Sequence, residues 1–137
     1  MAAVEKQFRK RNAILAYLKE TKTHPSAEMV FAHLKPSIPD LSLGTVYRNL
    51  TKFREQGDII SLGAVNGVER FDGNTVPHVH FICRNCSDVT DLPSLPIPEA
   101  LAESAAAQTG GCIDTCQLTF HGLCSACKNQ LKGGESA

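Results

Sequence analysis

The chain has 137 residues, a formal net charge of zero and an apolar fraction of 42%, which excludes global disorder. No stretch approaches the roughly 18 apolar residues that a membrane span needs, and the first residues lack the long apolar core of a secretory signal. We therefore expect a cytoplasmic protein without a membrane partner, made of one domain or two small ones. Its six cysteines would stay reduced there, so metal binding is their leading explanation.

The charge is distributed unevenly along the chain. Residues 1–75 carry 11 Lys and Arg against 8 Asp and Glu, whereas residues 76–137 carry 3 against 6. A mildly basic half suits nucleic acid, while an acidic half rich in Cys and His suits cations. Because the cysteines begin only at Cys83, we place a domain boundary near residues 73–77 and expect domains at 1–75 and 76–137.

Three helices are predicted in the first half. Apolar residues at helical spacing indicate a helix over about residues 5–20, and Ser26 can cap a second helix that reaches about Leu34. A third helix lies between Ser42, a good N-cap residue, and Gly57, a good residue just past a helix C-terminus.

The third helix has an apolar stripe and an opposite polar face. A core-facing stripe backed by cations and a tyrosine is typical of a helix that binds in the DNA major groove. If this helix is considered alone, the alternative to DNA binding is that its polar face is simply exposed to solvent. The candidate DNA contacts on it are Thr45, Tyr47, Arg48 and Lys52.

Two strands follow the third helix, over residues 58–62 and 68–71, with the hairpin turn signal Asn66 and Gly67 between them. Three helices followed by a hairpin predict a winged helix-turn-helix. Arg70, on the second strand, would contact the DNA phosphate backbone or pair with an acidic side chain.

The second half predicts strands over residues 78–82, 89–92 and 113–120, and a helix over 98–108 that is stopped by two glycines. The fold class is therefore α+β. This half is too small to hold a large core alone, so metal binding and dimerisation would supply further stability.

Two Cys-x-x-Cys pairs with 37 residues between them predict the first metal site. Four thiolates with no open position are typical of a structural zinc and not of a catalytic one. The gap exceeds the usual zinc-ribbon spacing, so the site would tie two distant strand ends together. A redox-active pair or incidental buried thiols are the alternatives. The predicted ligands are Cys83, Cys86, Cys124 and Cys127.

A second group of candidate ligands combines imidazoles with carboxylates. Residues 78 and 80 point to the same face of a strand, so both imidazoles can bind one ion. Three nitrogens and two oxygens suit Fe(II) or Mn(II) better than a thiol-rich site would. Taken singly, each residue also has an ordinary structural role at a helix end, turn or strand end. The predicted ligands are His24, Asp72, His78, His80 and Asp91.

Five stretches, in their order and spacing, resemble the ferric-uptake-regulator (Fur) superfamily over nearly the whole chain: residues 24–28 (HPSAE), 41–50 (LSLGTVYRNL), 70–72 (RFD), 78–86 (HVHFICRNC) and 122–127 (GLCSAC). The resemblance implies an N-terminal winged helix-turn-helix DNA-binding domain and a C-terminal α/β dimerisation domain. It also implies a homodimeric repressor of double-stranded operator DNA, with structural zinc on the four cysteines and a sensing metal at the hinge between the domains.

Within this superfamily the chain resembles the peroxide-sensing (PerR) branch, which uses three His and two Asp for the sensing metal. Iron-sensing members usually have Glu at the positions of Asp72 and Asp91. They also often have an additional site, whose positions hold Val79 and Cys116 here. The alternative is an iron-responsive, or otherwise metal-responsive, repressor without peroxide chemistry.

The resemblance to this branch implies a mechanism for sensing. Bound Fe(II) would react with hydrogen peroxide, and the ligating His24 or His78 would be oxidised. The protein would then leave its operator and derepress oxidative-stress genes, whereas Mn(II) would support DNA binding without peroxide chemistry.

Two other function classes fit the pattern less well. A hydrolase that used the His and Asp ligands would need an open coordination position and a general base, and five ligands leave little room for either. A protein-interaction module held together by zinc would not explain the pattern of the third helix.

Cys112 and Cys116 are additional thiols, about 13 Å apart on a strand and too far apart for a disulfide. We expect both to be small buried residues, with a thiol-based redox role as the alternative.

Overall fold

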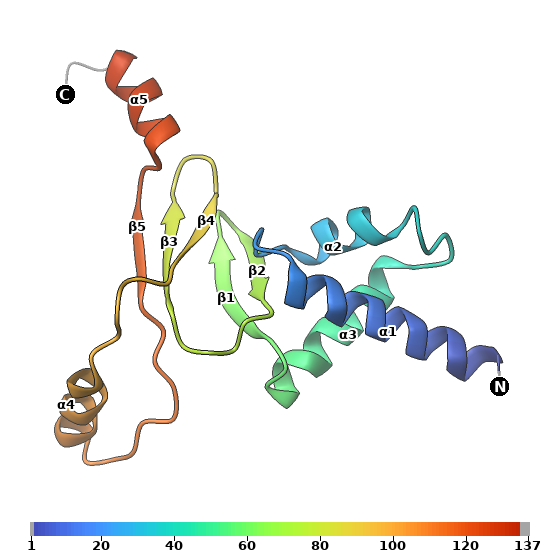
Figure 1. Cartoon of the computed structure of the whole chain (residues 1–137), viewed down its shortest axis with the longest axis horizontal. Helices are drawn as coiled ribbons and strands as arrows, with labels where there is room; N and C mark the ends of the chain where they lie inside the picture. The colour runs from blue at the N-terminus through green and yellow to red at the C-terminus, as the bar shows by residue number, and fades with distance from the viewer. Residues whose placement is uncertain (1, 135–137) are drawn as a thin grey trace. The chain divides into compact units, whose positions relative to one another are not determined.

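The computed structural model describes residues 2–134 and shows a mixed α+β fold with five helices and two small sheets in that range (Figure 1). The chain forms two compact units, residues 1–75 and residues 76–137. Within the described range, no helix combines the length and the apolar character needed to cross a membrane.

The first unit contains three helices followed by a hairpin, which is the winged-helix arrangement (Figure 1). Its elements are α1 (Ala2–Glu20), α2 (Ala27–Leu34), α3 (Leu43–Gln56), β1 (Ile60–Val65) and β2 (Val68–Asp72). The helices and the hairpin share one apolar core, to which α1 contributes Ile14 and Leu18, and α3 contributes Val46, Leu50 and Phe53.

The helix ends of this unit follow from local side-chain chemistry. The Ser26 hydroxyl accepts the backbone N–H of Met29 at 3.2 Å and caps α2. The Ser42 hydroxyl accepts the backbone N–H of Thr45 at 3.1 Å and caps α3. At the other end of α3, Gly57 has a φ of +81°, the left-handed conformation that glycine adopts without steric cost.

The hairpin of the first unit turns at Asn66 and Gly67, whose φ angles of +50° and +84° suit a two-residue turn. β1 and β2 are antiparallel, with an irregularity between Ser61 and Gly63. β1 begins later than the expected strand over residues 58–62. It also ends later, because the pairing with β2 continues to the turn.

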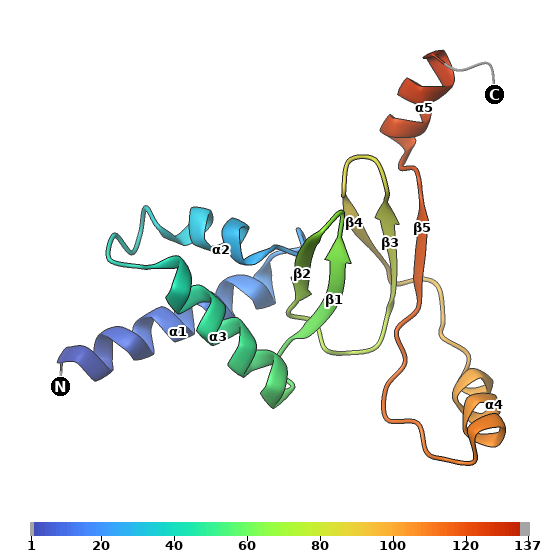
Figure 2. The same ribbon diagram turned by 180° about the vertical axis from the view of Figure 1, so that it is seen from behind.

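The second unit is built on a three-stranded sheet in the order β4-β3-β5 (Figure 2). β3 (Val79–Cys83) is antiparallel to β4 (Val89–Leu92) and parallel to β5 (Thr119–Gly122). The helices are α4 (Glu99–Thr109), before β5, and α5 (Ser125–Gly134), after it. Since β3 and β5 run in the same direction, both end at the same edge of the sheet.

The late part of the second unit differs from the sequence prediction. The expected strand over residues 113–120 is only β5, and residues 112–118 have no regular secondary structure. Cys112 and Cys116 lie in this segment, and both are exposed in the single chain. The prediction that these two thiols are buried is therefore wrong for this chain, because no strand carries them against a core.

Candidate metal centres and nucleic-acid interface

The four cysteines predicted to bind zinc meet at the edge of the sheet where β3 and β5 end. Cys83 is the last residue of β3, and Cys86 closes the turn that follows it. Cys124 follows β5, and Cys127 lies in the first turn of α5. The parallel register places Cys83 opposite Gly122, so both Cys-x-x-Cys pairs start from neighbouring strand ends.

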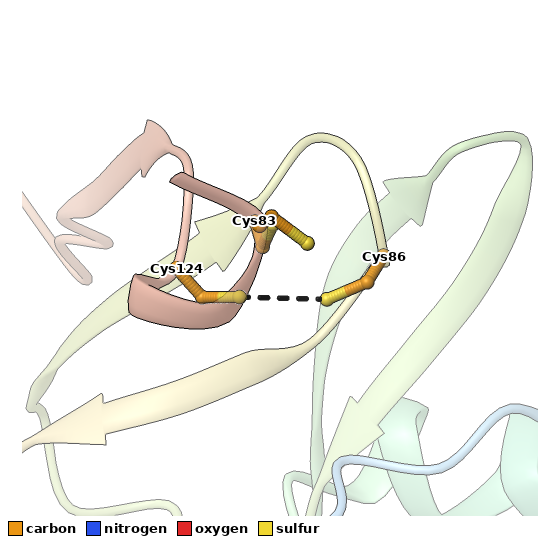
Figure 3. Close-up of side chains that lie close together, drawn as sticks. Cys83, Cys86 and Cys124 are labelled. Carbon is orange, nitrogen blue, oxygen red and sulfur yellow. Dashed lines mark hydrogen bonds between the residues drawn. The ribbon is translucent and has the colours of Figure 1, made fainter. Parts of the chain in front are cut away.

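The geometry of this cluster fits a tetrahedral ion. The four Sγ atoms lie within 4.8 Å of one another. The Cys86 and Cys124 sulfurs are 3.8 Å apart, and Figure 3 shows these two side chains pointing toward each other. A zinc with Zn–S bonds of about 2.3 Å has S···S edges of about 3.8 Å, whereas a disulfide is about 2.05 Å long. The Asn85 amide donates a hydrogen bond to the Cys127 sulfur at 3.3 Å. This donor set fits a structural zinc.

The acidities of the thiols indicate why the cluster needs a cation. Backbone N–H groups of Cys86 and Cys124 lower the pKa of the Cys83 thiol to about 6. The backbone N–H of Asp88 acts to lower the pKa of Cys86, yet the neighbouring thiols and burial together raise it to about 12. The Cys83 thiol thus loses its proton easily, whereas its neighbour Cys86 resists deprotonation. A dication among the sulfurs stabilises all the thiolates together, because every metal-bound thiol is deprotonated.

The five residues predicted to bind the second metal fall into two groups, one in each unit. In the first unit, His24 and Asp72 are both buried, with His24 Nε2 3.4 Å from Asp72 Oδ2. Asp72 ends β2, and its Oδ1 accepts the backbone N–H of Asn74 at 2.8 Å. His24 lies in the connection between α1 and α2 and has a φ of +51°.

In the second unit, the β3–β4 ladder holds His80 and Asp91, and His78 directly precedes β3. His80 is the cross-strand partner of Asp91, and the Asp91 Oδ1 atom lies 3.3 Å from His80 Nε2 and 2.9 Å from His78 Nε2. The backbone carbonyl of Val76 lies 2.6 Å from His78 Nδ1, which orients this ring. The nitrogen and carboxylate donors of both groups are those that Fe(II) and Mn(II) prefer.

The polar face of α3 opens onto a groove with basic walls. Of the candidate DNA contacts, Tyr47, Arg48 and Lys52 are exposed and Thr45 is half-buried. The groove, of about 470 Å³, lies between α3 and α1 and carries four cations: Lys10, Arg11, Arg48 and Lys52. The two cations from α1 were missed by sequence reasoning, which considered the third helix alone. The sequence did contain a signal for them, because Lys10 and Arg11 lie within one turn of the predicted first helix.

Tyr47 is tethered to the preceding helix. Its hydroxyl donates a 2.5 Å hydrogen bond to the carboxylate of Glu28, in the first turn of α2. This hydrogen bond lowers the pKa of Glu28 and raises the pKa of Tyr47. The tether fixes the ring on the exposed face of α3, and the sequence contained no pattern that linked these two residues.

Replacing Tyr47 with phenylalanine is expected to return the pKa of Glu28 towards its ordinary value of 4.5. A lowered pKa in the folded state stabilises the protein above the unfolded pKa, and this contribution disappears as the pH falls through the folded value. The wild type should therefore be slightly more stable than the Tyr47→Phe variant at pH 7, and equally stable below the folded pKa of Glu28. An NMR titration of the Glu28 carboxyl and denaturation at the two pH values measure both effects. An unchanged Glu28 pKa would contradict the tether.

Arg70 does not occupy the position expected of a phosphate contact. Its side chain is buried with 9% exposure. Its guanidinium donates hydrogen bonds to the backbone carbonyls of His24 and, at 2.8 Å, of Thr23. Main-chain carbonyls thus accept from two of its nitrogen donors. The assignment of Arg70 as a DNA contact stays a prediction, and this burial argues against it.

A winged-helix unit followed by a unit with a four-cysteine zinc site defines a class of metal-responsive transcription regulators. The chain belongs to the ferric uptake regulator family, whose model matches residues 5–121. Members of this family are DNA-binding regulators and not enzymes, which confirms the prediction of a regulator. The family also confirms the predicted fold class, an N-terminal winged helix with a C-terminal dimerisation domain.

Relatives with established names include peroxide regulators. The peroxide operon regulator of Bacillus subtilis is 35% identical over 120 residues, which cover 88% of this chain and 82% of the relative. The peroxide-responsive repressor PerR of Staphylococcus aureus is 34% identical over 122 residues, covering 88% and 80%.

Solved structures with a similar fold come from both peroxide and iron regulators. A Campylobacter jejuni peroxide stress regulator has a TM-score of 0.76 at 24% identity, with 89% of this chain and 91% of that chain covered. A ferric uptake regulator from Francisella tularensis, solved with iron, has a TM-score of 0.69 at 27% identity, with 86% and 90% covered.

Proposed function

We propose that this protein is a homodimeric, metal-dependent repressor that binds double-stranded operator DNA in the cytoplasm and responds to hydrogen peroxide. The observation that carries the proposal is the set of three imidazoles and two carboxylates, which is separate from the four thiolates of the zinc site. The names of the Bacillus and Staphylococcus relatives support peroxide as the signal.

The regulatory ion, Fe(II) or Mn(II), would be held by residues from both units. His24 and Asp72 belong to the first unit, and His78, His80 and Asp91 belong to the second. An ion bound to all five ligands would fix the orientation of one unit relative to the other. Metal binding would then favour the orientation that fits the operator, which couples metal occupancy to DNA affinity.

Peroxide sensing would depend on oxidation of a ligating imidazole. Bound Fe(II) supplies the redox chemistry that activates peroxide, which Mn(II) does not supply under the same conditions. In the overall change, one peroxide oxygen is inserted into a ring C–H bond, so the carbon gains a C–O bond and its hydrogen moves to a heteroatom, and the other peroxide oxygen leaves as water. An oxidised His24 or His78 is a poorer ligand, so the constraint between the units is lost and the operator is released.

DNA binding is assigned to the exposed face of α3. Thr45, Tyr47, Arg48 and Lys52 are the proposed contacts, with base edges bound by the helix and phosphates bound by the cations of the groove. Arg70 is left out of this set because it is buried and donates to two main-chain carbonyls of the first unit.

The second unit is proposed to form the dimer. α4 has no buried residue in the single chain, and Leu101 on this helix is 46% exposed. Phe120 on the outer strand β5 is 49% exposed. Apolar side chains on a helix and a strand edge that the single chain does not cover favour a second copy as their partner.

The proposal is tested with a DNA duplex selected from a random library by the Mn(II)-loaded protein. We expect metal-dependent binding with either Fe(II) or Mn(II), and release after modest peroxide only for the Fe(II) form. Mass spectrometry should then find one added oxygen on the peptides that carry His24 or His78. A variant with Cys112→Ser and Cys116→Ser should respond like the wild type, and loss of its response would favour a thiol sensor instead.

The alternative is an iron-responsive or otherwise metal-responsive repressor without peroxide chemistry. It predicts the same metal-dependent DNA binding, with no added oxygen on either histidine and no release by modest peroxide. DNA binding that is independent of metal would contradict both functions.

A further inference from the structure

The buried guanidinium of Arg70 donates hydrogen bonds to the segment that carries His24. A buried cation needs acceptors for its donors, and here the acceptors include the carbonyl oxygens of Thr23 and His24. Arg70 itself lies on β2, in the hairpin, 46 and 47 residues later in the chain than its two acceptors. This side chain therefore joins the hairpin to the connection between α1 and α2.

The two carbonyls that Arg70 contacts are the ones that determine the backbone conformation of His24. The Thr23 carbonyl belongs to the peptide plane before the His24 Cα atom, and the His24 carbonyl belongs to the plane after it. Fixing both planes fixes φ and ψ of His24, and thereby the direction of its Cβ atom. The backbone N–H of Phe71 also donates to the Pro25 carbonyl at 3.0 Å and holds the next part of the segment.

His24 needs such support because its backbone conformation is unfavourable. Its φ of +51° lies in the left-handed region, which is uncommon and usually unfavourable for residues with a Cβ atom. In that conformation its ring is buried, with Nε2 3.4 Å from the carboxylate of Asp72. Arg70 and Asp72 are two residues apart on β2, so their side chains leave the strand on the same face. One holds the main chain of His24 and the other contacts its ring.

We infer that Arg70 is a positioning residue for the metal ligand His24 and not a DNA contact, an inference that rests on the proposed function. The planar guanidinium reaches two carbonyls at once from a fixed geometry. A lysine at this position keeps the charge but offers a single ammonium on a flexible chain. Metal affinity should therefore depend on the shape of this side chain as well as on its charge.

The test compares Arg70→Lys with wild type for Mn(II) affinity, measured by competition with a chelating dye, and for DNA affinity at saturating Mn(II). Outer-shell partners of metal ligands typically contribute about 10- to 100-fold to affinity, and we expect a loss of that size. At saturating Mn(II), DNA affinity and its salt dependence should stay close to wild type. Unchanged Mn(II) affinity with a salt slope reduced by about one would overturn the inference and make Arg70 a phosphate contact.

Lys52→Ala is the matched control, because Lys52 is an exposed cation on α3. It should lower DNA affinity and reduce the salt slope by about one while leaving Mn(II) affinity unchanged. The opposite patterns of the two variants would separate a positioning cation from a DNA-binding cation.

A double-mutant cycle with His24→Ala distinguishes positioning from general destabilisation. If Arg70 acts through His24, Arg70→Lys lowers Mn(II) affinity no further once His24 is absent. Equal losses in both backgrounds would overturn the inference. A wild type whose DNA binding does not depend on metal would instead contradict the proposed function, while the Mn(II) cycle would still measure the link between Arg70 and His24.

Discussion

Replacing Cys83 with serine is expected to release the zinc and unfold the second unit while the first unit stays folded. Metal binding in small zinc-dependent folds contributes about 10–16 kcal/mol to the free energy of folding, and a site with three thiolates keeps only part of this contribution. The second unit has few other sources of stability, because its sheet has three strands and α4 buries no residue in the single chain. The first unit keeps its own apolar core around Phe53.

Zinc per chain, measured by inductively coupled plasma mass spectrometry, should fall from about one to below about a tenth. Amide NMR should lose the dispersed signals of the second unit and keep those of the first, and light scattering should show a monomer. Cys112→Ser is the matched control, because Cys112 is exposed and lies outside the four-cysteine cluster. It should keep the zinc and the dimer. A Cys83→Ser protein that keeps a full zinc would contradict the assignment of the site.

Local signals in the sequence predicted most of the first unit. Ser26 and Ser42 cap their helices as expected because an N-cap depends only on the next three residues. Asn66 and Gly67 form the turn because both tolerate a positive φ. The four cysteines were also predictable, since each pair forms a local turn and only their convergence requires the fold.

Several features that sequence reasoning missed depend on contacts between distant segments. β5 is short because only four of its residues pair with β3, and no alternation along residues 113–120 encodes that limit. α5 begins directly after Cys124 and was not predicted. The role of Arg70 on the main chain of His24 was missed because two of its acceptors are main-chain carbonyls, which are the same for every amino acid and leave no trace in a sequence pattern.

Gly73 was likewise recognised only as part of a domain boundary, although it has a specific structural role next to the ligand Asp72. A Cβ atom at this position would lie 2.2 Å from the carbonyl oxygen of Leu18, near the end of α1, and 2.8 Å from the backbone nitrogen of Lys19. Both neighbours are main chain, so no side chain can rotate away to make room. The Lys19 ammonium strengthens this close approach by donating hydrogen bonds to the carbonyls of Gly73, at 2.8 Å, and Asp58, at 2.7 Å.

Gly73→Ala is therefore expected to force α1 and the end of β2 apart. Overpacking against a rigid neighbour costs about 1–3 kcal/mol, and we expect the upper part of that range because the clash is with backbone. The shift would also move Asp72 away from His24, so Mn(II) affinity should fall even at temperatures where the variant is fully folded. Urea denaturation of the metal-free protein and Mn(II) competition measure the two effects separately.

Gly111→Ala provides the control for adding a methyl group to a glycine. A Cβ atom at Gly111 would have only the hydroxyl of Thr109 nearby, at 3.7 Å, which is an ordinary contact distance. This variant should match the wild type in both measurements. If Gly73→Ala matched it as well, the contact between α1 and the end of β2 would have to be looser in solution than in the structure. A loss of stability without a loss of Mn(II) affinity would limit the role of Gly73 to packing. A loss of both makes the end of α1 part of the support for Asp72.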